Sequence, residues 1–277
     1  MRIIENKCFD EERALYGERG LLLRNCRFEG EADGESAFKE GGDIECHACY
    51  FNLRYPFWHN KNILIDSSEM TDLCRAPIWY SENVKINSTK MHSTKAIREC
   101  KNIKIFECDI NSDEFGWFCN GISIESASIE GEYFMLRACN IRLKNSSFIG
   151  KYSFQYIENA IIENCNLDTK DAFWHAKNVT VKNCTVMGEY LGWYSSNLTF
   201  ENCKIIGTQP ICYAENICII NCEMINCDLA FEKSTVYAEI TTPLISIKNP
   251  KGGKITAPEI KKIIADNEEA SCEIIIK

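Results

Sequence analysis

The same short pattern of residues recurs at a nearly fixed spacing through most of this 277-residue chain and limits the folds that it can adopt. Each repeat opens with Asn, or with a residue in its place, followed by two apolar residues that flank one residue of any type. The openings lie at Asp43, Asn62, Asn83, Asn102, Gly121, Asn140, Asn159, Asn178, Asn197, Asn216 and Thr235. A fixed period of roughly 19 residues is typical of a solenoid, in which each repeat forms one coil.

The residues within a repeat form three apolar columns. Val179 and Val181 illustrate the first, since they alternate with polar residues as in a strand that buries one face. Asn183 and Cys184 follow as a corner, where stacked Asn side chains are expected to hydrogen-bond from coil to coil. The second strand contains Phe51, Ile110, Phe148, Leu167 and Ile205. The third contains Phe57, Ile78, Ile97, Met135, Phe154, Phe173 and Ile211.

Three short strands without a helical period predict an all-β, single-stranded right-handed parallel β-helix, because parallel crossovers are nearly always right-handed. About eleven 19-residue coils fit residues 20–242 of this single predicted domain, between caps at 1–19 and 243–277. The N-terminal cap is expected to contain a short helix beginning at Asp10. The C-terminal cap is expected to begin a helix at Pro258 and to end in a strand.

A leucine-rich repeat is the alternative architecture. The segment from Val179 to Val186 fits its pattern of apolar residues around Asn and Cys. The rest of each repeat, however, is short and aromatic, where a helix or a long extended return would be expected.

The charge and composition of the chain limit the kinds of partner and the location that we expect for it. Forty acidic and 31 basic residues give a net charge of -9, so neither nucleic acid nor a membrane is an expected partner. The N-terminus lacks the apolar core of a signal peptide, and the 17 cysteines are an odd number, so the predicted location is a reducing cytoplasm. No cofactor and no metal site are expected, and no catalytic residue is identified.

All five tryptophans stand four places before a repeat opening, in a column of candidate ligand-binding residues. Its candidates are Trp58, Trp79, Arg98, Trp117, Gln155, Trp174 and Trp193. The sequence leaves open whether the column packs inward as core or faces outward. If it faces outward, the guanidinium of Arg98 would lie between the indoles of Trp79 and Trp117. If it is buried, Arg98 needs a partner such as Glu99.

The next column along adds the candidates His59, Tyr80, His175 and Tyr194. Aromatic rings beside hydrogen-bonding groups suit sugars, which have apolar faces and hydroxyl edges. A solvated aromatic flank without a ligand fits these residues equally well.

Several segments of the chain resemble one family in the same order. They include IIENKCFDEERALYGERG, LRYPFWH, RAPIWY, TKDAFWH, GEYLGWYS and IKNPKGGKITA. The family is the uncharacterised bacterial domain of unknown function 3737. The resemblance implies a right-handed β-helix similar to pectate-lyase-like proteins, and it implies no activity.

Two functions follow as hypotheses. The first is binding or processing of a carbohydrate, such as an oligosaccharide, on the aromatic face. The second is a non-catalytic scaffold that presents this face to another protein.

Overall fold

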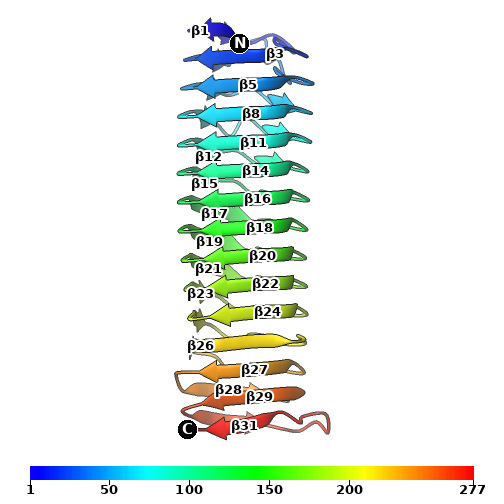
Figure 1. Ribbon diagram of the computed structural model, residues 1–277, viewed down its shortest axis with the longest axis vertical. Coiled ribbons are helices and arrows are strands. Elements are labelled where there is room, and N and C mark those ends of the chain that lie inside the picture. Colours follow the sequence, from blue (N-terminus) through cyan, green and yellow to red (C-terminus); the bar gives the residue numbers. More distant parts are fainter. The chain divides into compact units, whose positions relative to one another are not determined.

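The computed structural model describes residues 1–277 as strands, turns and loops, without any helix. Residues 1–142 and 143–277 form two compact units, which are described in turn. In each unit the first-sheet strands on the near face run from right to left while the chain descends, so the coils are right-handed (Figure 1). The predicted all-β parallel β-helix is therefore confirmed, and the leucine-rich repeat is not what forms. The chain has no helix that is long and apolar enough to cross a membrane.

In residues 1–142 each coil contributes one strand to a first sheet and one to a second, and neighbouring coils pair in parallel. The first-sheet strands are β1 (Arg2–Glu5), β3 (Arg19–Arg24), β5 (Gly42–His47), β8 (Lys61–Asp66), β11 (Glu82–Asn87), β14 (Lys101–Phe106), β16 (Asn120–Glu125) and β18 (Cys139–Lys144), the last of which spans the unit boundary. The second-sheet strands are β2 (Cys8–Phe9), β4 (Arg27–Phe28), β6 (Tyr50–Phe51), β9 (Glu69–Met70), β12 (Lys90–His92), β15 (Asp109–Asn111) and β17 (Ser128–Glu132). A third sheet consists of β7 (Phe57–Trp58), β10 (Ile78–Trp79) and β13 (Ile97–Arg98).

Residues 143–277 repeat the arrangement with two sheets and one separate pair of strands. The first-sheet strands are β20 (Glu158–Glu163), β22 (Lys177–Lys182), β24 (Ser196–Glu201), β26 (Ile217–Ile225), β27 (Thr235–Ile240), β29 (Gly252–Ala257) and β31 (Glu273–Ile276). The second-sheet strands are β19 (Ser147–Lys151), β21 (Asn166–Lys170), β23 (Thr185–Met187) and β25 (Lys204–Ile206), and the later part of β26 continues this sheet. The separate pair is β28 (Leu244–Lys248) with β30 (Ile260–Ile264).

The predicted alternation and corners are both present. Val179 and Val181 of β22 are at most 1% exposed and point into the core of the coil. At the repeat opening and again at the corner after the strand, Asn residues adopt a left-handed backbone, as at Asn178 (φ 55°) and Asn183 (φ 52°). Their side-chain amides bond from coil to coil, with Asn178 Nδ2 3.2 Å from Asn159 Oδ1. Asn tolerates this backbone better than most residues, so the Asn positions set both the corners and the ladders.

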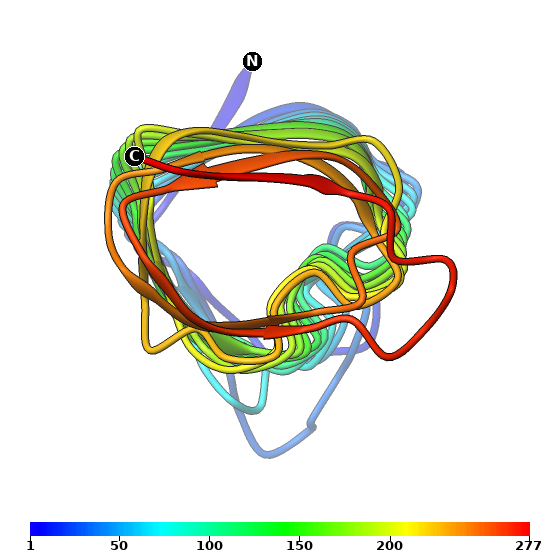
Figure 2. The ribbon, with the colours of Figure 1, turned by 90° about the horizontal axis from the view of Figure 1, so that it is seen from below.

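The third apolar column is buried throughout but is a strand only in part of the chain. Phe57, Ile78 and Ile97 begin the strands of the third sheet. From Met135 onward the equivalent residues lie in turns or bends, where Met135 (φ 63°), Phe154 (φ 56°) and Phe173 (φ 61°) have left-handed backbones. The third strand was therefore wrong for those coils. Figure 2 shows that the chain bends inward at these turns, which brings the aromatic rings into the core.

The longer coils place their additional residues outside. The coil that opens at Gly20 continues to Asp43, and the one that opens at Asn62 continues to Asn83, so both exceed the usual spacing. Both leave the common path as outward loops (Figure 2), on which Asp33 and Leu73 are exposed. The outward loop predicted for the polar stretch around Asp33 is thus present.

Both terminal helices predicted from the sequence were wrong. Residues 10–17 form turns because their backbone N–H groups bond to the next coil, as from Leu15 to the carbonyl of Ala37 at 2.8 Å. The residues after Pro258 form β30, whose Ile260 pairs with Leu244 of β28. The coil therefore continues into both end segments, and the chain has about 14 turns instead of about eleven.

Candidate functional site

The tryptophan column of residues 1–142 lies at the surface, half-buried. Strands β7, β10 and β13 hold Trp58, Trp79 and Arg98 in register, and Arg98 pairs through its backbone with Trp117. The rings of Trp58 and Trp79 stack with centroids 5.6 Å apart. Lys39 Nζ lies 4.2 Å from the Trp58 ring. The column is therefore a continuous stack of indoles and cations.

Arg98 combines the two arrangements that the sequence left open. Its guanidinium carbon lies 5.5 Å from the Trp79 ring centroid and 5.3 Å from that of Trp117. Its Nε also lies 3.2 Å from Glu99 Oε1, and its side chain is 22% exposed. A second carboxylate, on Glu114, is 3.9 Å from its Nη1. Arg98 thus has cation-π contacts and carboxylate partners at a partly exposed position.

We expect Arg98→Ala to lower the free energy of unfolding by about 0.5–3 kcal/mol. The estimate adds cation-π contacts of about 0.5–2 kcal/mol to partly screened ion pairs of about 0–1 kcal/mol. Urea denaturation midpoints measure the loss. Arg75→Ala is the matched control, since Arg75 is exposed and forms no ion pair, and it should change stability by less than about 0.5 kcal/mol. A loss as small as the control's would mean that the stack does not stabilise the fold.

In residues 143–277 the side-chain N–H groups of the same column donate hydrogen bonds to backbone carbonyls of the next coil. Trp174 Nε1 donates to the carbonyl of Tyr190 at 2.7 Å, and Trp193 Nε1 donates to that of Gln209 at 2.8 Å. Gln155 Nε2 donates likewise to Asp171 at 3.0 Å. These side chains fasten successive coils together, which gives them a structural role whatever they bind.

The adjacent aromatic column of this unit forms a second stack, more exposed than the first. The centroids of Tyr156 and His175 are 4.7 Å apart, those of His175 and Tyr194 5.0 Å, and those of Tyr194 and Tyr213 5.2 Å. Partial burial and nearby Lys177 hold the pKa of His175 below its usual value, which favours the neutral ring. Because neighbouring rings cover one another's faces, mainly ring edges face the solvent.

In residues 1–142, His59 and Tyr80 belong to the equivalent column and pack less regularly. Their centroids are 5.1 Å apart, with the rings tilted by 60°. His59 Nδ1 lies 2.9 Å from Glu40 Oε1. The structure thus brings Trp58, Trp79 and Tyr80 together in this unit, while Trp174, Trp193 and Tyr194 form a separate group in the other.

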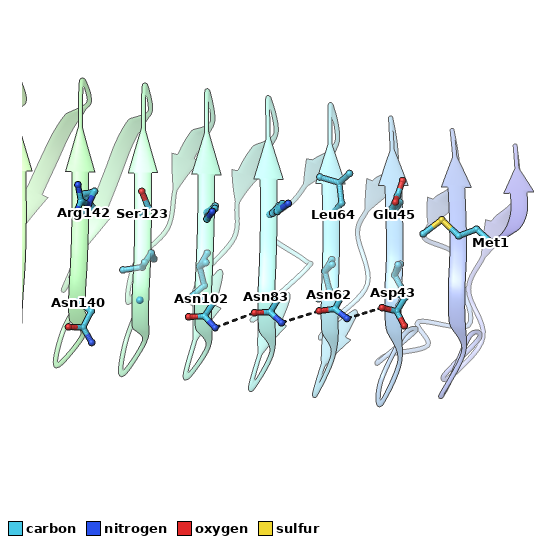
Figure 3. Close-up of a pocket in the computed structure, with 17 residues that line it drawn as sticks. Met1, Asp43, Glu45, Asn62, Leu64, Asn83, Asn102, Ser123, Asn140 and Arg142 are labelled. Atoms are coloured by element: carbon cyan, nitrogen blue, oxygen red, sulfur yellow. Dashed lines mark hydrogen bonds between the residues drawn. The ribbon is translucent and has the colours of Figure 1, made fainter.

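A long surface depression of the first unit lies elsewhere, on the outer face of its first sheet. This trough has a volume of about 900 Å³ and crosses the six coils that open from Asp43 to Asn140. Two rows of side chains border it (Figure 3). One row is the ladder of Asp43, Asn62, Asn83, Asn102, Gly121 and Asn140. The other is the outward row of Glu45, Leu64, Lys85, Lys104, Ser123 and Arg142.

The trough offers repeated amide groups and three cations without an ion-pair partner, together with the carboxylates of Asp43 and Glu45 at one end. The cations Lys85, Lys104 and Arg142 stand on the outward row without a carboxylate within 4.0 Å, whereas Lys61 at its margin pairs with Glu82 at 3.6 Å. No group of three or more His, Cys, Asp or Glu side chains is placed to hold a metal ion. The Asn amides of the trough can hydrogen-bond to hydroxyl groups, and its Lys and Arg side chains can attract anionic groups.

Comparisons with solved structures identify proteins of low similarity. PfbA, a surface adhesin of Streptococcus pneumoniae, is 13% identical over 87% of this chain and 75% of that chain, with a TM-score of 0.40. The A-module of the mannuronan C-5 epimerase AlgE4 of Azotobacter vinelandii is 9% identical over 99% and 87%, with a TM-score of 0.34. HetL, a pentapeptide repeat protein from Nostoc sp. strain PCC 7120, is 10% identical over 80% and 92%, with a TM-score of 0.32. Such scores carry no argument about function.

A search of curated proteins gives no match. The resemblance seen in the sequence segments is nevertheless confirmed at the level of the family. The model of the family described as protein of unknown function (DUF3737) matches residues 2–277, and the chain therefore belongs to this family.

Proposed function

We propose that this chain binds a linear oligosaccharide along the trough of residues 1–142. The observation that carries the proposal is the trough itself, in which side-chain amides recur in four of the six coils and cations stand on three of them. Adjacent coils are about 4.8 Å apart. A chain of sugar rings laid along this axis would meet a side-chain amide at most steps and a cation at three of them. No reaction is assigned.

The aromatic columns are a second proposed contact surface, and they favour a different partner. Tyr156, His175 and Tyr194 expose ring edges more than ring faces, because the rings stack on one another. Sugar rings bind best to open aromatic faces, whereas Tyr edges that carry hydroxyl groups are common in protein interfaces. This geometry supports protein binding there, as a scaffold, alongside carbohydrate binding in the trough.

The test is calorimetric titration of the full chain with two hexasaccharides, one of β-1,4-linked glucose and one of α-1,4-linked galacturonate. We expect measurable binding of at least one. Ser123→Trp should weaken it at least about tenfold, a loss of about 1.4 kcal/mol or more, because the indole would fill the trough. Thr199→Trp is the matched control, since Thr199 lies on the outward face of β24 in the other unit.

Two outcomes overturn the proposal. One is the absence of binding for both hexasaccharides. The other is binding that survives Ser123→Trp but is lost in Tyr194→Ala, which would place the carbohydrate site on the aromatic columns.

A further inference from the structure

The amide ladder along the trough has one gap. Asn62 donates to Asp43 at 2.8 Å, Asn83 to Asn62 at 3.0 Å, and Asn102 to Asn83 at 3.2 Å. The next position is Gly121, which has the same left-handed backbone (φ 77°) but no side chain.

The gap leaves the Asn102 amide oxygen without a donor, although it points at the missing side chain. A Cβ placed on Gly121 would lie 3.2 Å from Asn102 Oδ1. No protein group donates to this oxygen, whereas Asn62 Oδ1 and Asn83 Oδ1 each accept from the following coil. The ladder is therefore interrupted at Asn102, whose acceptor faces the place of the missing side chain, an open notch within the trough, and it resumes where Asn140 Nδ2 donates to Asn120 Oδ1 at 2.8 Å.

Positive charge surrounds this notch on the outward row. Ser123 lies two residues after Gly121, Lys104 pairs with Ser123 from the preceding coil, and Arg142 occupies the same row in the following coil. The two cations are therefore roughly 10 Å apart along the axis, at about 4.8 Å per coil. Neither has a carboxylate within 4.0 Å, although the whole chain carries a net charge of -9. The nearest carboxylate on β16 is Glu125, two residues beyond Ser123.

We infer that the trough beside Gly121 is a subsite for one uronate residue, with its carboxylate above Ser123 and a hydroxyl in the notch, and that the oligosaccharide of the trough is a uronate polymer. The inference rests on the proposed function and specifies its ligand. A carboxylate above Ser123 lies between the ammonium of Lys104 and the guanidinium of Arg142, and it accepts a hydrogen bond from the Ser123 hydroxyl. A neighbouring sugar hydroxyl donates to Asn102 Oδ1. Charge-assisted hydrogen bonds of this kind are stronger than neutral ones.

Gly121→Asn tests the notch without damaging the fold. Asn accepts the left-handed backbone, completes the ladder and should keep or raise the thermal midpoint, but its amide fills the notch. We expect galacturonate hexasaccharide to bind at least about tenfold more weakly, because the added amide displaces the sugar residue and with it one or two of its charge-assisted hydrogen bonds. Gly20→Asn is the matched control, since Gly20 is left-handed (φ 67°), opens the first repeat and lies outside the trough. Undiminished binding by folded Gly121→Asn overturns the subsite.

The double variant Lys104→Gln, Arg142→Gln tests the charge. It should weaken galacturonate binding at least about tenfold and reduce its dependence on salt, whereas any binding of the glucose hexamer should fall less. If wild-type protein binds glucose and galacturonate hexamers equally well, the uronate inference fails and the proposed function stands. If it binds neither, the proposed function itself fails.

Discussion

Ile162→Asp is expected to lower the free energy of unfolding by about 5 kcal/mol, the largest effect of any single side-chain change considered for this protein. Ile162 is 0% exposed and pairs with Val181 across the first sheet. Aspartate there would be an unpaired carboxylate in an apolar core, in addition to the lost apolar packing. Since each coil contacts mainly its neighbours, disorder at one coil removes support from the coils on either side.

The preceding residue provides the control. Ile161 belongs to the same strand but is 36% exposed on the outer face. Ile161→Asp should cost about 1 kcal/mol or less, the range of strand propensity at exposed positions. Denaturant midpoints of the two variants compare the same chemical change on opposite faces. Equal losses would contradict the alternation on which the coil depends.

Gly188→Ala is expected to destabilise the protein by about 3 kcal/mol or more. Gly188 follows β23 and has φ of 151°, a backbone that other residues rarely adopt. An added Cβ would lie 1.6 Å from the carbonyl oxygen of Thr169 in the preceding coil. Backbone cannot move aside as a flexible side chain can, so the substitution must separate the coils locally.

Gly17→Ala distinguishes this clash from backbone preference. Gly17 also has a positive φ, of 69°, but an added Cβ would meet nothing within 4 Å. Its cost should be about 1–2 kcal/mol, the usual cost of a left-handed backbone for a residue with a Cβ. Thermal unfolding of both variants is the measurement. If the two midpoints fall equally, close coil contact at Gly188 is not what requires glycine.

The repeated part of the fold was predictable because the same pattern of residue types recurs in each coil. Asn178 and Asn183 show them together: an Asn at each corner with a left-handed backbone, and inward Val179 and Val181 between. The outward alternative for the tryptophan column placed Arg98 between two indoles, as the structure has it, because equal spacing along the chain becomes stacking along the axis, but the sequence did not choose between that alternative and an inward column. Their role in ligand binding stays a prediction.

The ends were not predictable from local signals. Pro258 precedes a segment that suits a helix start, yet Ile260 pairs with Leu244 because an open strand edge binds the next segment of chain. The same holds for Leu15, whose N–H bonds to Ala37 instead of a carbonyl four residues earlier. Tertiary pairing overrides helix propensity at both places.

The trough was missed although its signal was present. Gly121 stood out as the one opening between Asn62 and Asn216 that lacks Asn. Lys85 and Lys104 looked like ordinary solvated residues, and only the structure shows that neither has a carboxylate partner on the row. Whether a charged side chain has an ion-pair partner depends on the side chains of the neighbouring coils, so it cannot be read from a single repeat.

The left-handed corners also determine how this chain can change its length. Deleting one residue between Asn178 and Asn183 would move one corner out of line with the coils on both sides, and would turn the strand's apolar side chains toward solvent. Deleting one complete repeat would remove one residue from every ladder. The Asn side chains of the coils on either side could then hydrogen-bond to each other. Within a unit, therefore, viable insertions and deletions should come as whole coils.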